Sequence, residues 1–145
     1  MPFQDRSAIP PHIVVSPLDT RNKIESLLLR TQDHVFFYVQ TLTDDRMIDI
    51  IRGLIDSGKH VEICTADNES NRSRQQEFPS WQWKTIKKPY LHAKVIIRDG
   101  SEVFIGSHNL TTNAIENNRE MGIILSQRAD IIEKIGSDFL KDGCR

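Results

Sequence analysis

The sequence predicts an α/β fold, in which a β-sheet is layered with helices. Two amphipathic helical segments alternate with two apolar strand segments between residues 20 and 65, the order typical of α/β proteins. Residues 34–40, HVFFYVQ, are mostly β-branched and aromatic, as expected for a strand covered on both faces. A length of 145 residues is sufficient for one domain with its own hydrophobic core.

The first elements are defined by prolines and by helix-capping residues. Residues 1–12 carry three prolines and no periodicity, so we interpret them as a leader or linker and expect the domain to span 13–145. A short apolar run at 13–15 is followed by a Ser-Pro break and then by a helix capped by Asp19 or Thr20. The expected buried stripe of this helix is Ile24, Leu27 and Leu28, with Thr31 at its end.

The next helix has the clearest pattern in the chain. Asp44 and Asp45 stand at its positive end, and Gly58 closes it. Its apolar residues follow helical spacing: Met47, Ile48, Ile51, Leu54 and Ile55. Residues 60–65, HVEICT, then predict a further strand.

The second half of the chain contains mostly strands. Residues 66–80 are polar and unpatterned, and they predict a long loop that is functional or mobile. Strands are expected at 81–86, 91–98 and 102–106, and the dipeptide Asp99-Gly100 predicts a hairpin between the last two. After a loop at 107–118, residues 119–126 predict a strand and residues 129–141 a closing amphipathic helix.

Composition limits the range of partners and compartments. A net charge of -1 means that a nucleic-acid partner would need a local basic patch. Cys64 and Cys144 lie 80 positions apart and match no metal or disulfide spacing, so we expect reduced thiols in a cytosolic-type setting. The chain shows no signal peptide and no apolar run of membrane-spanning length. We therefore expect a cytoplasmic protein or one peripheral to a membrane.

His92 and Lys94 carry the chemistry of the predicted strand 91–98. Side chains two positions apart on a strand point to the same face, so this histidine and lysine are expected side by side. Burying both without partners would be costly, which favours a position at a pocket. Lysine supplies a point charge for a phosphoryl oxygen, and imidazole can act as nucleophile, base or acid. The pair is typical of phosphate chemistry.

Residues 92–120, HAKVIIRDGSEVFIGSHNLTTNAIENNRE, resemble the HKD signature of the phospholipase D superfamily. In that signature His-x-Lys-x4-Asp-Gly precedes Gly-Ser-x-Asn and a later Glu. The likeness extends over most of the chain from residue 13 onward, except for the segment 66–80. It implies a three-layer α-β-α sandwich with a mixed central sheet.

The resemblance also implies roles for individual residues. His92 would attack phosphorus to form a covalent phosphohistidine, or would protonate the leaving group. Lys94 and Asn109 would hold the non-bridging phosphate oxygens. Ser107 would place a hydroxyl next to that site, and Glu120 would hydrogen-bond the histidine and orient it.

Asp99 matches the motif aspartate, but its place in a hairpin turn suggests a structural role. The resemblance implies no metal and no cofactor, and the sequence contains no metal-ligand cluster. The family reaction needs two histidines from two copies of the motif, whereas this chain has one copy. The second would come from a homodimer or from a sister half in a longer polypeptide. The likeness of residues 4–21 to the linker of tandem bacterial members favours the sister half.

Three functions fit these observations. The favoured one is a metal-independent phosphodiesterase acting on phospholipid, either phospholipase D-like or a cardiolipin-synthase-like phosphatidyltransferase. An endonuclease is the first alternative, because aromatic and basic side chains interleave between residues 81 and 98: Trp81, Trp83, Lys84, Lys87, Lys88, Tyr90 and Arg98. These aromatics could equally be core residues under a solvated basic rim. A non-catalytic half used for binding or dimerisation is the second alternative.

Two further residues lie close to these motifs. His108 sits within the signature, and we interpret it as a solvated loop histidine. Gln40 ends a predicted strand, where its side chain could either reach the pocket or pair with a backbone group.

Overall fold

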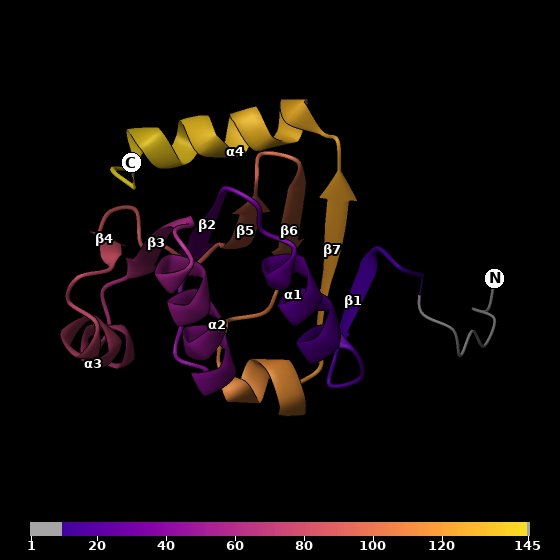
Figure 1. Cartoon of the computed structure of the whole chain (residues 1–145), viewed down its shortest axis with the longest axis horizontal. Coiled ribbons are helices and arrows are strands. Elements are labelled where there is room, and N and C mark those ends of the chain that lie inside the picture. The colour runs from indigo at the N-terminus through magenta and orange to yellow at the C-terminus, as the bar shows by residue number, and fades with distance from the viewer. Residues whose placement is uncertain (1–9, 145) are drawn as a thin grey trace.

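The structure, a computed structural model, describes residues 10–144, so the expected leader lies almost entirely outside the described residues. Figure 1 shows one sheet with helices packed around it. The strands are β1 (Ile13–Ser16), β2 (His34–Val39), β3 (His60–Ala66), β4 (Gln82–Ile86), β5 (Lys94–Arg98), β6 (Glu102–Gly106) and β7 (Glu120–Ser126). The helices are α1 (Thr20–Leu29), α2 (Asp45–Asp56), α3 (Glu69–Glu77), the short π-helix η1 (Asn113–Asn117) and α4 (Ala129–Lys141).

The seven strands form one mixed sheet in the order β1-β7-β6-β5-β2-β3-β4. The pairs β2/β3 and β3/β4 are parallel, because α2 and α3 carry the chain back between them. The pairs β2/β5, β5/β6, β6/β7 and β1/β7 are antiparallel. The predicted α/β class with a mixed central sheet is confirmed.

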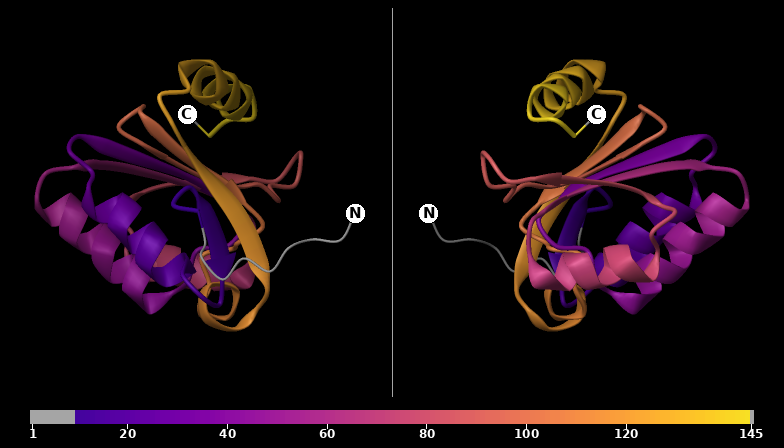
Figure 2. Two further views of the ribbon diagram at one scale, coloured as in Figure 1. Left: turned by 90° about the vertical axis from the view of Figure 1, so that its right-hand side faces the viewer. Right: turned by 90° about the vertical axis from the view of Figure 1, so that its left-hand side faces the viewer.

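Helices cover both faces of this sheet, which makes three layers (Figure 2). On one face, α1 and α2 bury the predicted stripe residues, including Ile24, Leu28 and Ile51, against the sheet. On the other face, α4 packs Phe139 against strand residues such as Tyr38 and Val95. The sheet therefore has a separate hydrophobic core on each face.

Within residues 10–144, no helix combines the length and the apolar character that a membrane span requires.

The predicted helix ends are largely confirmed. The Asp44 carboxylate caps α2 by accepting a hydrogen bond from the backbone N–H of Met47, and Gly58 follows the helix with a φ of +90°. Asp19 occupies the N-cap position of α1, but its carboxylate accepts from the backbone N–H of Val15. Asp19 therefore fixes the turn after β1 and does not cap the helix.

The expectation of a long loop at 66–80 is wrong, because α3 occupies Glu69–Glu77. Its sequence, ESNRSRQQE, has no apolar stripe, so hydrophobic periodicity could not predict it. The buried residue of α3 is Asn71, whose side-chain amide donates to the backbone oxygens of Gln40 and Ala66 and accepts from the N–H of Leu42. Asn71 thus fastens the ends of β2 and β3. A loop was likewise expected at 107–118, where η1 forms.

The reduced state expected for Cys64 and Cys144 is also wrong. The two residues form a disulfide, with their Cα atoms 5.6 Å apart. Cys64 lies in β3, and Cys144 follows α4, which crosses the sheet to reach it. Spacing in the sequence could not reveal this contact because it depends on the path of α4.

Asp99 forms the hairpin turn that the sequence predicts, together with Gly100. Both residues have positive φ values, 53° and 62°, and they are the central residues of a tight turn in which the Ser101 N–H donates to the Arg98 backbone oxygen. The Asp99 carboxylate accepts hydrogen bonds from the backbone N–H groups of Gln32, Asp33 and His34. Burial would raise its pKa, but these three donors and the charge of Arg98 outweigh burial and hold the pKa at about 2.

We expect Asp99→Ala to lower the free energy of unfolding by about 2 kcal/mol, because three backbone N–H groups at the surface lose one charged acceptor that holds them together. Asp99→Asn keeps an acceptor and tolerates positive φ, so we expect about half that loss. The folded-state pKa is below the ordinary value of 3.8, so this stabilisation is complete above about pH 4 and is lost as the pH falls towards 2. Urea unfolding from pH 2 to pH 7 measures both effects, and equal stability of Asp99→Ala and the unmodified protein would contradict this role.

Candidate active site

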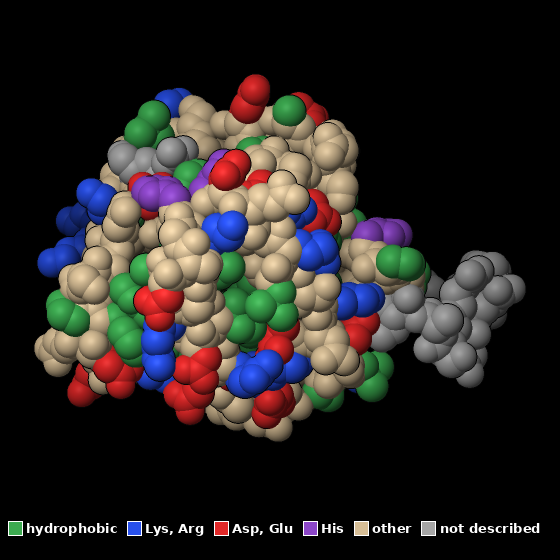
Figure 3. All heavy atoms as spheres, viewed as in Figure 1, with side chains coloured by type: hydrophobic (Ala, Val, Ile, Leu, Met, Phe, Trp, Pro, Cys, Tyr) green, Lys and Arg blue, Asp and Glu red, His purple; other side chains and the backbone are tan. Residues whose placement is uncertain are grey.

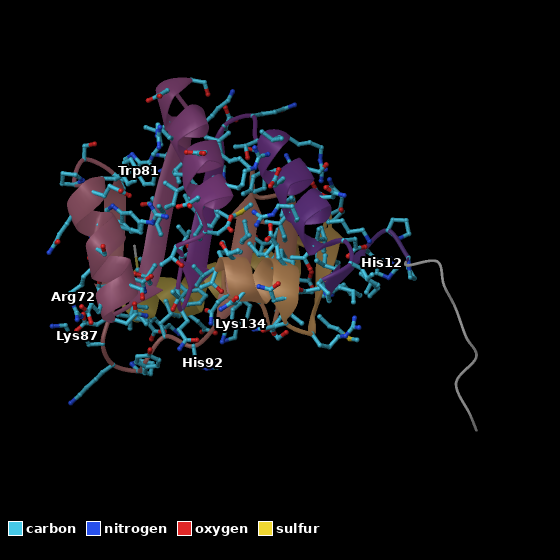
Figure 4. All side chains as sticks on the ribbon, turned by 90° about the horizontal axis from the view of Figure 1, so that it is seen from below. His12, Arg72, Trp81, Lys87, His92 and Lys134 are labelled. Atoms are coloured by element: carbon cyan, nitrogen blue, oxygen red, sulfur yellow. A yellow bond between two sulfur atoms is a disulfide. The ribbon has the colours of Figure 1, made fainter. Side chains whose placement is uncertain are left out.

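The predicted site residues come together at one end of the strands. At this end of the sheet β2, β3 and β6 end, while β5 and β7 begin. His92 comes just before β5 and Lys94 is its first residue, whereas Ser107 and Asn109 follow β6 and Glu120 begins β7. Figure 4 shows the labelled His92 at the outer rim of the molecule. Asp99 lies at the other end of β5, roughly 16 Å from Lys94 along the strand.

His92 lies outside the strand that the sequence predicts at 91–98. The β5 ladder begins at Lys94, which pairs with Val39, the last residue of β2. Beyond that point Gln40 still donates its backbone N–H to Ala93, but the regular pairing has ended. His92 is therefore exposed on the segment that leads into β5, and its ring and backbone oxygen contact the Lys94 side chain.

The Lys94 ammonium group lies against the ring of His92. Lys94 Nζ is 3.0 Å from His92 Nδ1 and 3.4 Å from Nε2, and it donates to the His92 backbone oxygen at 2.7 Å. The Lys94 side chain is only 8% exposed, whereas His92 is exposed. Burial lowers the pKa of Lys94, and the negative charge of Glu120 partly opposes this. A cation held in place beside an accessible imidazole can stabilise a phosphoryl group.

Asn109 is positioned by the end of β2. Its side-chain oxygen accepts from the backbone N–H of Thr41, and its amide donates to the side-chain oxygen of Gln40. The Gln40 amide in turn donates to the Tyr90 hydroxyl. Gln40 therefore reaches the site, which settles the two alternatives left open by the sequence. It connects the loop after β6 to the segment before His92.

Ser107 and Glu120 face each other across the β6/β7 pair. The Ser107 hydroxyl donates to the Glu120 carboxylate at 2.7 Å and accepts from the backbone N–H of Met121. The other carboxylate oxygen of Glu120 accepts from Asn118. The expected hydrogen bond in which Glu120 accepts from His92 stays a prediction.

Two glycines allow this close pairing. Gly106 and Gly122 lie opposite each other on β6 and β7. A Cβ atom on Gly106 would lie 2.8 Å from the Cα of Gly122, and one on Gly122 would lie 2.6 Å from the ring of Phe104. Larger residues at either position would force apart the strands that hold Ser107 and Glu120.

The interpretation of His108 as a solvated loop histidine is wrong. His108 is fully buried, with Nε2 2.9 Å from the Thr20 hydroxyl and its ring against Phe104. Burial lowers its pKa, against the opposing charges of Glu120 and Asp19. Because Thr20 belongs to α1, this contact anchors the loop that carries Ser107 and Asn109.

The basic and aromatic run at 81–98 divides into two parts. Trp81 stacks between Phe78 and Trp83, and these partly buried rings pack against the core beside α2. Exposed basic residues lie on β4, in the turn after it and on the neighbouring helix α3: Lys84, Lys87, Lys88 and Arg72. Figure 3 shows Lys and Arg side chains near β4 at the left edge of this face. The tryptophans therefore pack onto the core, beside the exposed basic residues.

The arrangement of acidic, histidine and cysteine side chains bears on metal binding. Within residues 10–144, no three or more of them are grouped so as to hold a metal ion. The polar groups at this end of the strands are instead the contacting pair Lys94 and His92, the side-chain amides of Gln40 and Asn109, and the Ser107 hydroxyl bonded to Glu120.

A family model described as "Cardiolipin synthase, PLD-like domain" matches residues 24–142. The chain belongs to this family. Membership confirms the resemblance to the phospholipase D superfamily that the motif at 92–120 indicates. No curated protein sequence matches the chain.

The fold is shared with many solved structures, including the following three. NucT from Helicobacter pylori is 25% identical, with a TM-score of 0.74, and the match covers 90% of this chain and 92% of that one. Nuc from Salmonella typhimurium, described as a phospholipase D family member, is 18% identical with a TM-score of 0.81 and coverages of 90% and 91%. Phosphatidylserine synthase from Haemophilus influenzae is 17% identical with a TM-score of 0.70, and the match covers 87% of this chain and 37% of the enzyme.

Proposed function

We propose that this PLD-like domain is a metal-independent phosphodiesterase that works through a covalent phosphohistidine on His92. The contact between the buried Lys94 ammonium and the exposed His92 ring carries this proposal. Phospholipid is the favoured substrate, and the reaction is either hydrolysis or transfer of the phosphatidyl group to an alcohol. The family's cardiolipin synthase description and the fold shared with phosphatidylserine synthase support this choice.

The proposed reaction has two displacements at phosphorus. In the first, a His92 ring nitrogen forms a bond to phosphorus as the bond from phosphorus to the leaving oxygen breaks. A second histidine protonates that oxygen, and Lys94 and Asn109 stabilise the non-bridging oxygens. In the second, water or an alcohol attacks the phosphohistidine, giving its proton to the second histidine and releasing His92.

The second histidine comes from a second copy of this chain or from a sister half in a longer polypeptide. The matches to NucT and Nuc span more than nine-tenths of those chains, which supports pairing of two copies. The match to phosphatidylserine synthase spans 37% of that enzyme, which supports a sister half. In both cases a single chain provides half of the active site.

The half-site proposal predicts how activity depends on assembly. The isolated 145-residue chain should either dimerise or stay monomeric and nearly inactive until a sister half is added. Light scattering combined with a phosphodiesterase assay over a range of protein concentrations measures this. Full, concentration-independent turnover by a strict monomer would contradict the need for a second histidine.

The proposed chemistry also predicts insensitivity to chelators. Phosphatidylcholine, phosphatidylglycerol, single-stranded DNA and RNA are assayed side by side. We expect the protein to cleave the phospholipids at the same rate with and without excess EDTA. The reason is that Lys94 supplies the positive charge that a metal ion provides in other phosphodiesterases. Loss of activity with EDTA and its recovery with Mg²⁺ or Zn²⁺ would contradict this mechanism.

An endonuclease is the second candidate, because the exposed side chains of Lys84, Lys87 and Lys88 could contact a phosphate backbone. Asp67 forms ion pairs with Lys87 and Arg72, which reduces the net charge of this rim. Lysines on an edge strand such as β4 also protect the sheet from pairing with other chains. The rim is therefore weaker support than the site itself, and cleavage of DNA or RNA but not of phospholipid would favour the endonuclease.

The remaining alternative, a non-catalytic half, predicts no turnover in any assembly. The expected cytoplasmic or membrane-peripheral location stays a prediction. The Cys64–Cys144 disulfide weighs against the cytoplasm, because disulfides persist mainly in oxidising compartments.

A further inference from the structure

A cavity of about 480 Å³ lies between the sheet and α4, with His92 in its wall. This volume is within the range usual for small-molecule sites. The wall is mostly apolar and includes Ile86, Leu91, Val95, Ile105, Ile135 and Phe139. It combines strand residues, the segment before β5 and one side of α4.

The charges around this cavity disfavour a polyanion. Among the described residues that line it there is no lysine or arginine, and its two carboxylates are Asp138, which is paired with Lys134 at 2.8 Å, and Asp142. A nucleic-acid backbone would require cations in the wall. An uncharged, apolar group is therefore the better complement to this surface.

The wall formed by α4 is fixed to the sheet. The rings of Phe139 and Tyr38 stack with their centroids 4.1 Å apart. Just beyond the helix, the Cys64–Cys144 disulfide ties the chain to β3. Because α4 is held at this end, the cavity exists before a ligand arrives, and binding does not require ordering of the wall.

The cavity also connects to the proposed phosphate site. Tyr90 and His92 both line it, and the Tyr90 hydroxyl accepts a hydrogen bond from Gln40, the residue that holds Asn109. A phosphoryl group placed between His92 and Asn109 would therefore have one ester substituent next to the apolar wall.

From this placement we propose that the cavity binds an aliphatic ester substituent of the phosphodiester, such as the lipid part of a phospholipid. The proposal rests on the function proposed above and assigns its substrate specificity to a defined wall. Ile135 is its central specificity-determining residue, because it faces the cavity from α4.

Calorimetric titration of the full chain with hexyl phosphate and with methyl phosphate tests the proposal without requiring turnover. We expect hexyl phosphate to bind at least about 10-fold more tightly, because each fully buried methylene gives roughly a fourfold gain in affinity. Ile135→Trp should fill the cavity and remove this preference. Ile132→Trp is the matched control, because Ile132 lies on the same helix but lines a different cavity, with Phe36 and Ile97.

Several results would overturn the proposal. One is equal affinity for the two phosphates, and another is an unchanged preference in Ile135→Trp. Tighter binding of thymidine 5′-phosphate than of hexyl phosphate, lost in Ile135→Trp, would assign the cavity to a nucleobase. A changed association state of Ile135→Trp in ultracentrifugation, with hexyl affinity unchanged, would assign it to a second copy of the chain.

A second variant is used if Ile135→Trp does not fold. If thermal melting shows that Ile135→Trp is unfolded, the smaller change Ile135→Phe replaces it. NMR contacts between the hexyl methylenes and the Phe139 ring of the unmodified protein then give an independent measurement. Their presence supports the proposal, and their absence at saturating ligand overturns it.

A kinetic comparison separates this proposal from the proposed function. The assembled protein is assayed on methyl and hexyl p-nitrophenyl phosphate, which share a leaving group. Cleavage of both at equal kcat/KM overturns the aliphatic site and leaves the phosphodiesterase intact. Cleavage of neither, with the hexyl preference present in calorimetry, removes the phosphodiesterase and supports the apolar site.

Discussion

Replacing His92 with alanine should lower phosphodiesterase turnover by roughly 10⁴-fold or more, because the nucleophile or the general acid is removed from each site. The fold should be unaffected. The His92 side chain is exposed, and its ring is in contact with the Lys94 ammonium group. Substitutions of this kind change the free energy of unfolding by about 0.5 kcal/mol or less. Turnover and thermal melting of the same preparation measure the two effects.

His60→Ala is the matched control. His60 is also an exposed histidine, but it begins β3, at the end of the strands opposite the site. We expect full turnover from this variant. Protein incubated with ³²P-labelled substrate and quenched with detergent at alkaline pH, where a phosphohistidine is stable, should carry a label that His92→Ala lacks. Substantial turnover by His92→Ala would contradict the assignment of His92 as the reacting residue.

We expect removal of the Cys64–Cys144 disulfide to lower the free energy of unfolding more than Asp99→Ala does. The bond closes a loop of 80 residues, and the chain-entropy model gives about 4.5 kcal/mol for a loop of that length. We therefore expect the Cys64→Ala/Cys144→Ala variant to unfold at much lower urea concentration than the oxidised protein. Urea titrations followed by circular dichroism measure the difference.

The reductant dithiothreitol supplies the control for this prediction. It should lower the urea midpoint of the unmodified protein towards that of the double variant, and it should leave the midpoint of the double variant unchanged. Two titratable thiols in protein purified without reductant, together with a midpoint insensitive to reductant, would contradict the presence of the disulfide.

The sequence predicted the main elements because their signals are local. The stripe of α2, with Ile48 and Ile51 at helical spacing, needs no tertiary information. The same applies to the Asp99-Gly100 turn, whose positive φ values these residue types favour. By contrast α3 is polar throughout, and its contribution to the fold comes from Asn71, which bonds to the ends of two strands.

The site was predictable as a set of residues but not as a set of contacts. The signature identified His92, Lys94 and Asn109, and the fold brings all three to one edge. Nothing in the sequence indicated that Tyr90 would bond to Gln40, because 50 residues separate them. The burial of His108 likewise depends on α1, whose Thr20 hydroxyl meets its ring. Such contacts depend on how distant segments pack.

The layer formed by α4 alone also affects how the molecule unfolds. Phe139 is the one buried residue among the described residues of α4, whereas α1 and α2 each bury four. An element with so little burial can detach at a lower free energy than the rest of the domain. Once the disulfide is cut, α4 and the second core can melt while the sheet and its opposite layer persist. Unfolding of the reduced protein is then a sequence of steps, and a single melting temperature does not describe it.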